Sequence, residues 1–318
     1  MTTYTIRRLI EGFVIIIAVT LIVFLMMRLL PGDPLSLYVA QNELSNMAPE
    51  QLHQLEVQFG LDKPLMVQYF VWIWDALRGN LGTSIFYQQN VTTLIEQRMP
   101  ITIHLGILAF ILSGILGILF GIICALKRGT WIDTTVTLLA NIGITLPSFW
   151  IAILLIYVFG LRLGLLPVFG YTSPFENFGL NAREVIMPVF CLAVFSIAGL
   201  TRQCRSTILE VVRQDYIRTA WAKGLSERVV VFRHTLKNAM IPVVTILGLQ
   251  IRLIFGGSVI IETVFNINGV GRLLTSAVFA QDFQVVQAGT LIIAIIVVLS
   301  NLLVDISYGW LDPRIRLG

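Results

Sequence analysis

Two parts of this sequence place charged side chains where they could do chemistry, although charged residues make up only 13% of the chain. Residues 215–238, DYIRTAWAKGLSERVVVFRHTLKN, carry charge at nearly every third or fourth position between two long apolar runs. Arg252 stands alone within the apolar run LGLQIRLIFGGSVIIE. A guanidinium at membrane depth is costly unless it faces a water-filled cavity or a partner. We therefore expect these charged side chains to contact a partner or to line a water-filled path, and not to catalyse a reaction.

The sequence carries no motif for nucleotide, metal or redox chemistry. It contains no GxxxxGK[ST] phosphate loop, so any nucleotide must be bound by a partner. The cysteines, Cys124, Cys191 and Cys204, lie in or beside apolar runs without CxxC spacing and are interpreted as packing residues. No series of Asp, Glu or His crosses the apolar runs, as a proton-coupled carrier would require. We expect no cofactor, no metal and no catalytic residue in this chain.

Composition identifies the elements that must position these side chains. The chain has 318 residues and is 56% hydrophobic, with a mean hydropathy of +0.84, well above the usage of soluble domains. Because a span needs about 20 residues and must satisfy its own backbone hydrogen bonds, each long apolar run predicts a transmembrane helix. The runs cover residues 9–27, 101–126, 135–160, 185–201, 239–261 and 285–308. The sequence thus predicts an all-α polytopic membrane protein with about six spans.

The distribution of Lys and Arg predicts the orientation. With the N-terminus inside, the outer loops receive half as many Lys and Arg as the inner ones. The positive-inside rule then places both termini in the cytoplasm, including the tail 312–318. The net charge of +4 follows from this asymmetry and indicates no nucleic-acid binding. Residues 1–30 are interpreted as a cytoplasmic start and an uncleaved first helix.

An outer segment, 31–99, separates the first two spans. Pro49, Gly60 and Gly79 are typical of helix ends, so short helices are expected. The stretch PLMVQYFVWIWDALRG is rich in Trp and Tyr, which favour the membrane interface. A lid packed on the spans and a docking surface for a partner remain open as its role.

Small and polar residues interrupt the second and third spans. Gly117 and Gly121 form a small-xxx-small pair that lets two helix backbones approach closely. Pro147 lies in the third run, where it removes a backbone hydrogen bond and predicts a kink, and Asn141 stands nearby. The kink marks either a translocation path or packing alone. Arg252 likewise either lines the path or pairs across a subunit interface.

The charged stretch predicts two short amphipathic helices joined by a turn. Residues 208–223 place apolar side chains at helical spacing with charged ones between them. Gly224 suits the left-handed conformation that ends a helix, and Ser226 suits the N-cap of a second helix that leads into the fifth span. Two helices held between the fourth and fifth spans would transmit an applied force to both.

This loop resembles the cytoplasmic loop of membrane subunits of binding-protein-dependent ABC importers. In that family a Glu-Ala-Ala triplet is followed four residues later by Gly, and here Arg218, Thr219 and Ala220 occupy the triplet. The dipeptide, oligopeptide and nickel branch is similar also in LLPGDP (29–34), FGLDKPL (59–65), GNLGTSI (79–85), ETVFNINGVGRLL (262–274) and DPRIR (312–316). The departures are Trp221, Asn268 and Arg252, where the branch usually has Arg, Pro and a small or apolar residue.

The resemblance implies a type I importer and its subunits. Two homologous permeases form the pore, two cytosolic ATPases bind ATP and Mg²⁺, and an extracytoplasmic binding protein delivers the substrate. Residues 100–311 would be the five-helix permease core in a bacterial or archaeal cytoplasmic membrane, with a coupling loop at 204–238. The residues implied at or near the ATPase contact are Arg218, Thr219, Ala220, Trp221, Gly224, Leu225 and Ser226, supported by Arg228, Arg233 and His234.

The resemblance ranks the substrates, while the residues themselves weigh against the rival functions. Di- or oligopeptides are expected first, with nickel chelates, glutathione-like peptides and oligosaccharides as alternatives. An ion-coupled secondary carrier would need a coupling site and inverted repeats, and neither is visible. An ion channel would need a filter or a charged ring, for which Arg252 alone is thin support. The sequence therefore predicts a permease without enzymatic activity of its own.

Overall fold

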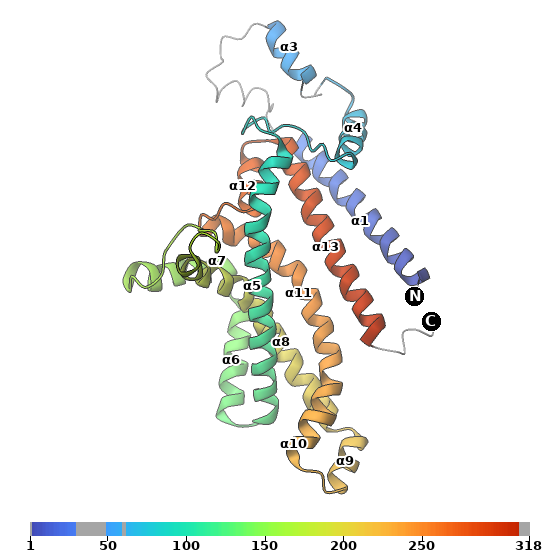
Figure 1. Cartoon of the computed structure of the whole chain (residues 1–318), viewed down its shortest axis with the longest axis vertical. Coiled ribbons are helices and arrows are strands. Elements are labelled where there is room, and N and C mark those ends of the chain that lie inside the picture. The colour runs from blue at the N-terminus through green and yellow to red at the C-terminus, as the bar shows by residue number, and fades with distance from the viewer. Residues whose placement is uncertain (1, 30–48, 59–61, 312–318) are drawn as a thin grey trace. The chain divides into compact units, whose positions relative to one another are not determined.

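The computed structural model of the chain describes residues 2–29, 49–58 and 62–311 and is drawn in Figure 1. Side chains are described for all of these except 2–5, 49, 52, 55, 58 and 305–311. Apart from an isolated bridge between Thr83 and Asn90, the regular secondary structure of the described residues is helical. The all-α class predicted from the sequence is confirmed.

Five described helices are long and apolar enough to cross a membrane, and a bent helix pair makes a possible sixth span. Their length reflects unbroken runs of Ile, Leu, Val and Phe, because a backbone in lipid must bond within its own helix. The long helices are α1 (Thr2–Leu29), α5 (Val91–Leu126), α8 (Phe178–Val212), α11 (Leu236–Val264) and α13 (Phe283–Leu311). The prediction of about six spans is confirmed.

The third predicted span is broken, not merely kinked. It consists of α6 (Trp131–Thr145) and α7 (Ser148–Leu155), which continues as the π-helical η1 (Ile156–Arg162), and the two parts meet at 107°. Leu146 has an extended backbone with ψ 131°, because the ring of Pro147 excludes the helical conformation from the preceding residue. The expectation of one continuous kinked helix over 135–160 is wrong for this reason.

The chain divides into two compact units. One consists mainly of Ile103–Ile267, and the other mainly of Arg7–Thr102 and Asn268–Val298. In the first unit α8 packs against α11, α6 and α7, and Figure 1 shows α8 and α11 side by side. A buried apolar cluster joins α8 to α11 at the ends that are predicted to face the cytoplasm. It includes Leu200, Cys204, Ile208, Ala239 and Val243.

Glycines set the approach of α5 to α8 within the first unit. A Cβ at Gly121 would lie 2.4 Å from Cβ of Cys204, and one at Gly117 would lie 2.6 Å from Cβ of Leu200. The hydroxyl of Thr201 donates to the carbonyl oxygen of Gly117 at 3.4 Å. The small-xxx-small pair is therefore a packing feature, as its spacing predicts.

The second unit contains α1, α3 (Pro49–Gln58), α4 (Leu65–Leu77), α12 (Val270–Phe279) and the adjoining parts of α5 and α13. Tyr69 and Trp72 of α4 are buried with Phe24 of α1. The fully buried carboxylate of Asp282 accepts hydrogen bonds from the hydroxyl of Ser84 and, at 3.1 Å, from the N–H of Phe86. This carboxylate fixes the loop that precedes α5 to the start of α13.

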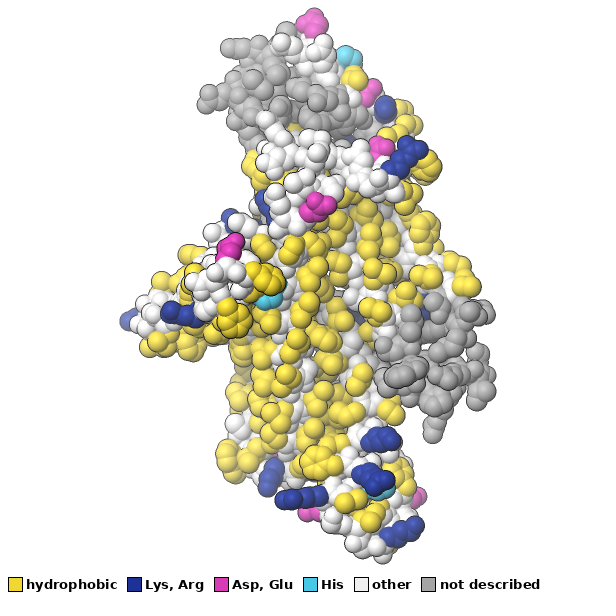
Figure 2. All heavy atoms as spheres, viewed as in Figure 1, with side chains coloured by type: hydrophobic (Ala, Val, Ile, Leu, Met, Phe, Trp, Pro, Cys, Tyr) yellow, Lys and Arg dark blue, Asp and Glu magenta, His cyan; other side chains and the backbone are white. Residues whose placement is uncertain are grey.

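Hydrophobic side chains cover most of the visible sides of the long helices in Figure 2, while Lys and Arg gather near α9 and α10. Exposed apolar residues such as Ile107, Ile111 and Ile115 of α5 recur at helical spacing. Such a face is stable against lipid or another membrane subunit. The extracytoplasmic placement of 31–99 stays a prediction, and its residues 31–48 and 59–61, like the tail 312–318, lie outside the described residues.

Candidate functional site

The predicted coupling loop contains a sharp turn at Gly224. Helix α9 (Asp215–Ala222) ends there, with Gly224 at φ +75°, and α10 (Glu227–Val229) begins directly after Ser226. The N–H of Gly224 donates to the carbonyl of Trp221 at 2.9 Å, so the helix end is satisfied. A Cβ at this position would meet no described residue within 4 Å. The conformation, not space, therefore requires glycine, and another residue would cost about 1–2 kcal/mol.

A small buried cluster holds the turn in place. Ile217 and Ala220 of α9 pack with Val230, and these side chains are 1%, 6% and 1% exposed. Val230 begins η2 (Val230–Thr235), which continues directly into α11. Burial of two fully covered aliphatic side chains contributes about 3–6 kcal/mol before entropy. Helix α9 is therefore fastened to the start of the α11 helix.

The helix boundaries of this loop differ from the predicted ones. The predicted helix over 208–223 is two helices, because α8 ends at Val212 and Gln214 has an extended backbone with ψ 148°. The second predicted helix is not a separate one: it runs without a break from Glu227 through η2 into α11. The turn at Gln214 lets Ile217 fold back onto Val230, and this tertiary contact overrides the helical pattern.

Most of the predicted contact residues lie on the outer surface of the loop. Trp221 is 46% exposed and Leu225 is 37% exposed. The exposed members of the predicted set are Arg218, Thr219, Trp221, Gly224, Leu225, Ser226, Arg228 and Arg233. Ala220 lies in the buried cluster, and His234 is half-buried with its carbonyl accepting from Asn238 at 3.0 Å. The exposed set combines cationic and apolar side chains, a composition suited to a protein partner.

The predicted pathway residues do not come together in this chain. Pro147 lines a cavity of about 360 Å³ with Ser196 of α8 and Gly257 of α11. Asn141 instead lines a separate hollow beside Asp133. Arg252 lies exposed on α11 and, among the described residues, has no hydrogen bond or ion pair. Its role in a path or at a subunit interface stays a prediction.

An ion pair that sequence reasoning missed joins α6 to α8. The guanidinium of Arg205 donates from Nε and Nη2 to the carboxylate of Asp133 at 2.7 and 2.9 Å. The N–H of Gly129 donates to the same carboxylate at 3.0 Å, and the Asp133 side chain is only 7% exposed. The two residues are 72 positions apart. The sequence offered one signal for this pair, namely an acidic residue, Asp133, in the first turn of α6.

A second missed contact lies between α8 and α11. The hydroxyl of Ser196 donates to the side-chain oxygen of Gln250 at 3.1 Å, and both residues are buried. A buried side-chain hydrogen bond between two spanning helices restricts how they slide or rotate. Gln250 lies two residues before Arg252 on α11, so the bond fixes the helix that carries the charge.

Two family descriptions match almost the whole chain. "Binding-protein-dependent transport system inner membrane component" matches residues 117–317, and "Binding-prot-dependent transport system membrane comp, N-term" matches residues 1–106. The first of these contains the turn at Gly224, the Asp133–Arg205 pair and Arg252. The match therefore extends over both compact units and the candidate residues.

Curated relatives are similar over their full length. A putative peptide transport system permease protein of Brucella abortus (strain 2308) is 41% identical, covering 99% of each chain. A putative peptide permease protein of Brucella suis biovar 1 (strain 1330) is 39% identical, covering 100% of each. Oligopeptide transport system permease protein AppB of Bacillus subtilis (strain 168) is 39% identical, covering 99% of this chain and 100% of that one.

Proposed function

The chain belongs to the family of binding-protein-dependent transport system inner membrane components, and we propose that it imports short peptides as one of two permeases in an ATP-driven transporter. The resemblance predicted from the sequence is confirmed by the family match. The chain is a permease of the ABC importer class with a helical membrane fold. We also propose its substrate, its partner subunits and its orientation in the membrane.

In the proposed transporter, different subunits bind ATP, deliver the peptide and form the path. ATP and Mg²⁺ are bound by two cytosolic ATPases, and an extracytoplasmic binding protein delivers the peptide. This chain and a homologous permease supply the path, so this chain itself catalyses no reaction. The absence of a phosphate loop from the sequence supports this division, because nucleotide binding then falls to a partner.

The single observation that carries the coupling role is the turn at Gly224 above its buried cluster. Arg218, Trp221 and Leu225 are exposed on it, while Ile217 is buried against the start of the α11 helix. A force on α9 is therefore passed to α11 through packed side chains and to α8 through the short turn at Gln214. Two packed helices that move together are the kind of element that converts between two discrete arrangements.

Charge reversal at the exposed surface tests the coupling role. We expect Arg218→Glu to lower co-purification of the ATPases and to abolish substrate-stimulated ATP hydrolysis. Lys237→Glu is the matched control, because it makes the same charge change at an exposed site on the first turn of α11 outside the predicted contact. Equal co-purification and equal hydrolysis in the two variants would argue against the assigned surface.

Substrate competition tests the peptide assignment. In proteoliposomes that contain all subunits, labelled dipeptide uptake should depend on ATP and on the binding protein. Unlabelled di- and tripeptides should compete, whereas nickel chelates and oligosaccharides should not. The names of the curated relatives support peptides as the substrate. Competition by a chelate or a sugar alone would reassign the substrate while leaving the importer role intact.

Cysteine labelling tests the orientation. With six spans, both termini lie in the cytoplasm, the loop after η1 lies outside and the loop after α5 lies inside. Phe175 is 98% exposed in the first loop, and Arg128 is exposed in the second. We expect Phe175→Cys to react only from outside and Arg128→Cys only from the cytoplasm. Reaction of both from the cytoplasm would show that the broken pair α6–α7 returns to the side on which it starts.

A further inference from the structure

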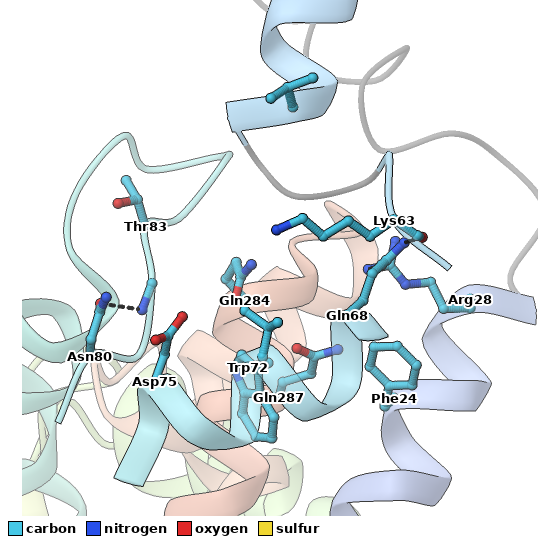
Figure 3. Close-up of a pocket in the computed structure, with 13 residues that line it drawn as sticks. Phe24, Arg28, Lys63, Gln68, Trp72, Asp75, Asn80, Thr83, Gln284 and Gln287 are labelled. Atoms are coloured by element: carbon cyan, nitrogen blue, oxygen red, sulfur yellow. Dashed lines mark hydrogen bonds between the residues drawn. The ribbon is translucent and has the colours of Figure 1, made fainter. Parts of the chain in front are cut away.

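A polar pocket of about 350 Å³ lies within the second compact unit. It is formed where the C-terminal end of α1, the face of α4 and the first turn of α13 meet the turn at 80–83. Figure 3 shows its lining side chains, with Arg28 and Lys63 on one side and Asp75 and Asn80 on the other. The volume lies in the range of small-molecule sites.

Several polar atoms around this pocket are buried and, within the described part of the chain, have no hydrogen-bond partner. They are the donors Nε of Arg28, Nε1 of Trp72 and Nε2 of Gln287, and the acceptor Oε1 of Gln284. Gln287 is only 3% exposed. Buried polar groups are almost always paired in folded proteins, since an unmade bond costs the full desolvation of the group. Their gathering at one pocket points to a ligand that supplies the missing partners.

The charges of the lining side chains define the chemistry of that ligand. The Arg28 guanidinium stacks on Phe283, with its carbon 4.5 Å from the ring centroid, and its Nη2 donates to the side-chain oxygen of Gln68. Among the described residues, Arg28 has no acidic partner. Lys63 and Asp75 likewise have no ion pair within the part of the chain that the structure describes. The pocket thus offers two uncompensated cations facing one uncompensated carboxylate.

We propose that this pocket binds a zwitterion, namely a short peptide with free termini. The peptide carboxylate, which can accept about four hydrogen bonds, would pair with Arg28 and take the donors of Trp72 and Gln287. The peptide ammonium would donate to Asp75 and to Oε1 of Gln284. The choice of a peptide over another zwitterion rests on the proposed function. Binding itself requires neither ATP nor a binding protein, so this chain would hold substrate on its own.

Calorimetry of the full chain in lipid nanodiscs, without partner subunits, tests the proposal. The probe is the dipeptide Ala-Ala, compared with its C-terminal amide and with its N-acetyl derivative. We expect saturable binding of Ala-Ala and weakening by about tenfold or more when either terminal charge is removed, the loss of one charge-assisted hydrogen bond. Absence of saturable binding, or equal binding of all three compounds, would overturn it.

Variants tie the binding to these side chains. Arg28→Gln and Gln287→Leu should each weaken binding of Ala-Ala by about tenfold or more. Arg78→Gln is the matched control. Arg78, at the C-terminal end of α4, also stacks on an aromatic ring, with its guanidinium carbon 4.6 Å from the centroid of the Trp74 ring, but it does not line the pocket. Circular dichroism of each variant establishes that it folds. If Arg28→Gln fails to fold, Arg28→Lys keeps the charge and loses the planar fork.

Uptake and binding measurements together distinguish a failure of the pocket proposal from a failure of the proposed peptide import. Peptide uptake by the complete transporter with no dipeptide binding to this chain overturns the pocket and leaves the importer intact. Dipeptide binding without any dipeptide uptake supports the pocket and overturns the proposed import of peptides. Capture of the binding protein that depends on Arg28, with no dipeptide binding, would assign the pocket to an acidic protein side chain instead and so overturn the proposal.

Discussion

The close approach of α5 to α8 makes Gly121→Ala the most sharply defined perturbation in the first unit. The added Cβ would lie 2.4 Å from Cβ of Cys204 and 3.0 Å from the carbonyl oxygen of Thr201. Ordinary contact for such atoms begins at 3.4 Å. The helices must therefore separate by about 1 Å, which in a close-packed interior costs about 1–3 kcal/mol. Neither neighbour can move out of the way cheaply, because one atom is backbone and the other is a Cβ.

Gly256→Ala on α11 is the matched control for this prediction. A Cβ there meets nothing within 4 Å in the part of the chain that the structure describes, and Gly256 has ordinary helical geometry. That variant should therefore gain up to about 1 kcal/mol of helix stability. Because this helix-propensity gain applies to both variants, denaturant unfolding of the chain in micelles should separate them by the cost of the clash, about 1–3 kcal/mol. In a Cys204→Gly background, Gly121→Ala should lower the free energy of unfolding by less, since the clashing Cβ is gone.

Equal unfolding free energies for the two glycine variants would refute the packing argument. The same holds if Cys204→Gly leaves the loss at Gly121 unchanged, because neighbours in contact must show coupling in a double-mutant cycle. A lowered stability of Gly256→Ala would contradict the open surroundings of this glycine among the described residues.

Three further substitutions test two buried polar contacts and the surroundings of Arg252. Asp133→Asn should lower the unfolding free energy by about 2 kcal/mol by removing the ionic partner of Arg205, and unchanged denaturant unfolding would contradict this. Asp282→Leu leaves the Ser84 hydroxyl and a backbone N–H without an acceptor, so it should cost about 3 kcal/mol and speed proteolysis of loop 79–90, whereas a resistant loop would contradict the assigned role. Arg252→Cys should react with a polar thiol reagent in at least one nucleotide state, and protection in every state would show burial at an interface.

The helical membrane architecture could be predicted from the sequence because its signals are local. Each span follows from an apolar run, and the turn at Gly224 follows from the need for a residue that tolerates positive φ, which the structure confirms at +75°. The approach of α5 to α8 likewise follows from Gly117 and Gly121, although the partner helix could not be named. These features depend on residues that are neighbours in the chain.

Features that depend on distant residues could not be predicted. The turn at Gln214 contains no glycine or proline, and it exists because Ile217 packs on Val230. The Asp133–Arg205 pair joins residues 72 positions apart, which one sequence cannot match. The sharp break at Pro147 was partly visible, since proline excludes the preceding residue from a helix, but the 107° angle is set by packing of the two parts on their neighbours.

The most direct test of the coupling claim is ATP-dependent dipeptide uptake by complete transporters that carry Gly224→Val or Gly224→Asn. Because a Cβ at this position meets nothing within 4 Å among the described residues, the variants should differ chiefly in how well their backbone tolerates φ +75°. Asn adopts that conformation readily and a β-branched residue does not. We expect near-normal uptake for Gly224→Asn and almost none for Gly224→Val, with membrane insertion unchanged in both. Normal uptake by Gly224→Val would contradict the claim that this turn couples the ATPases to transport.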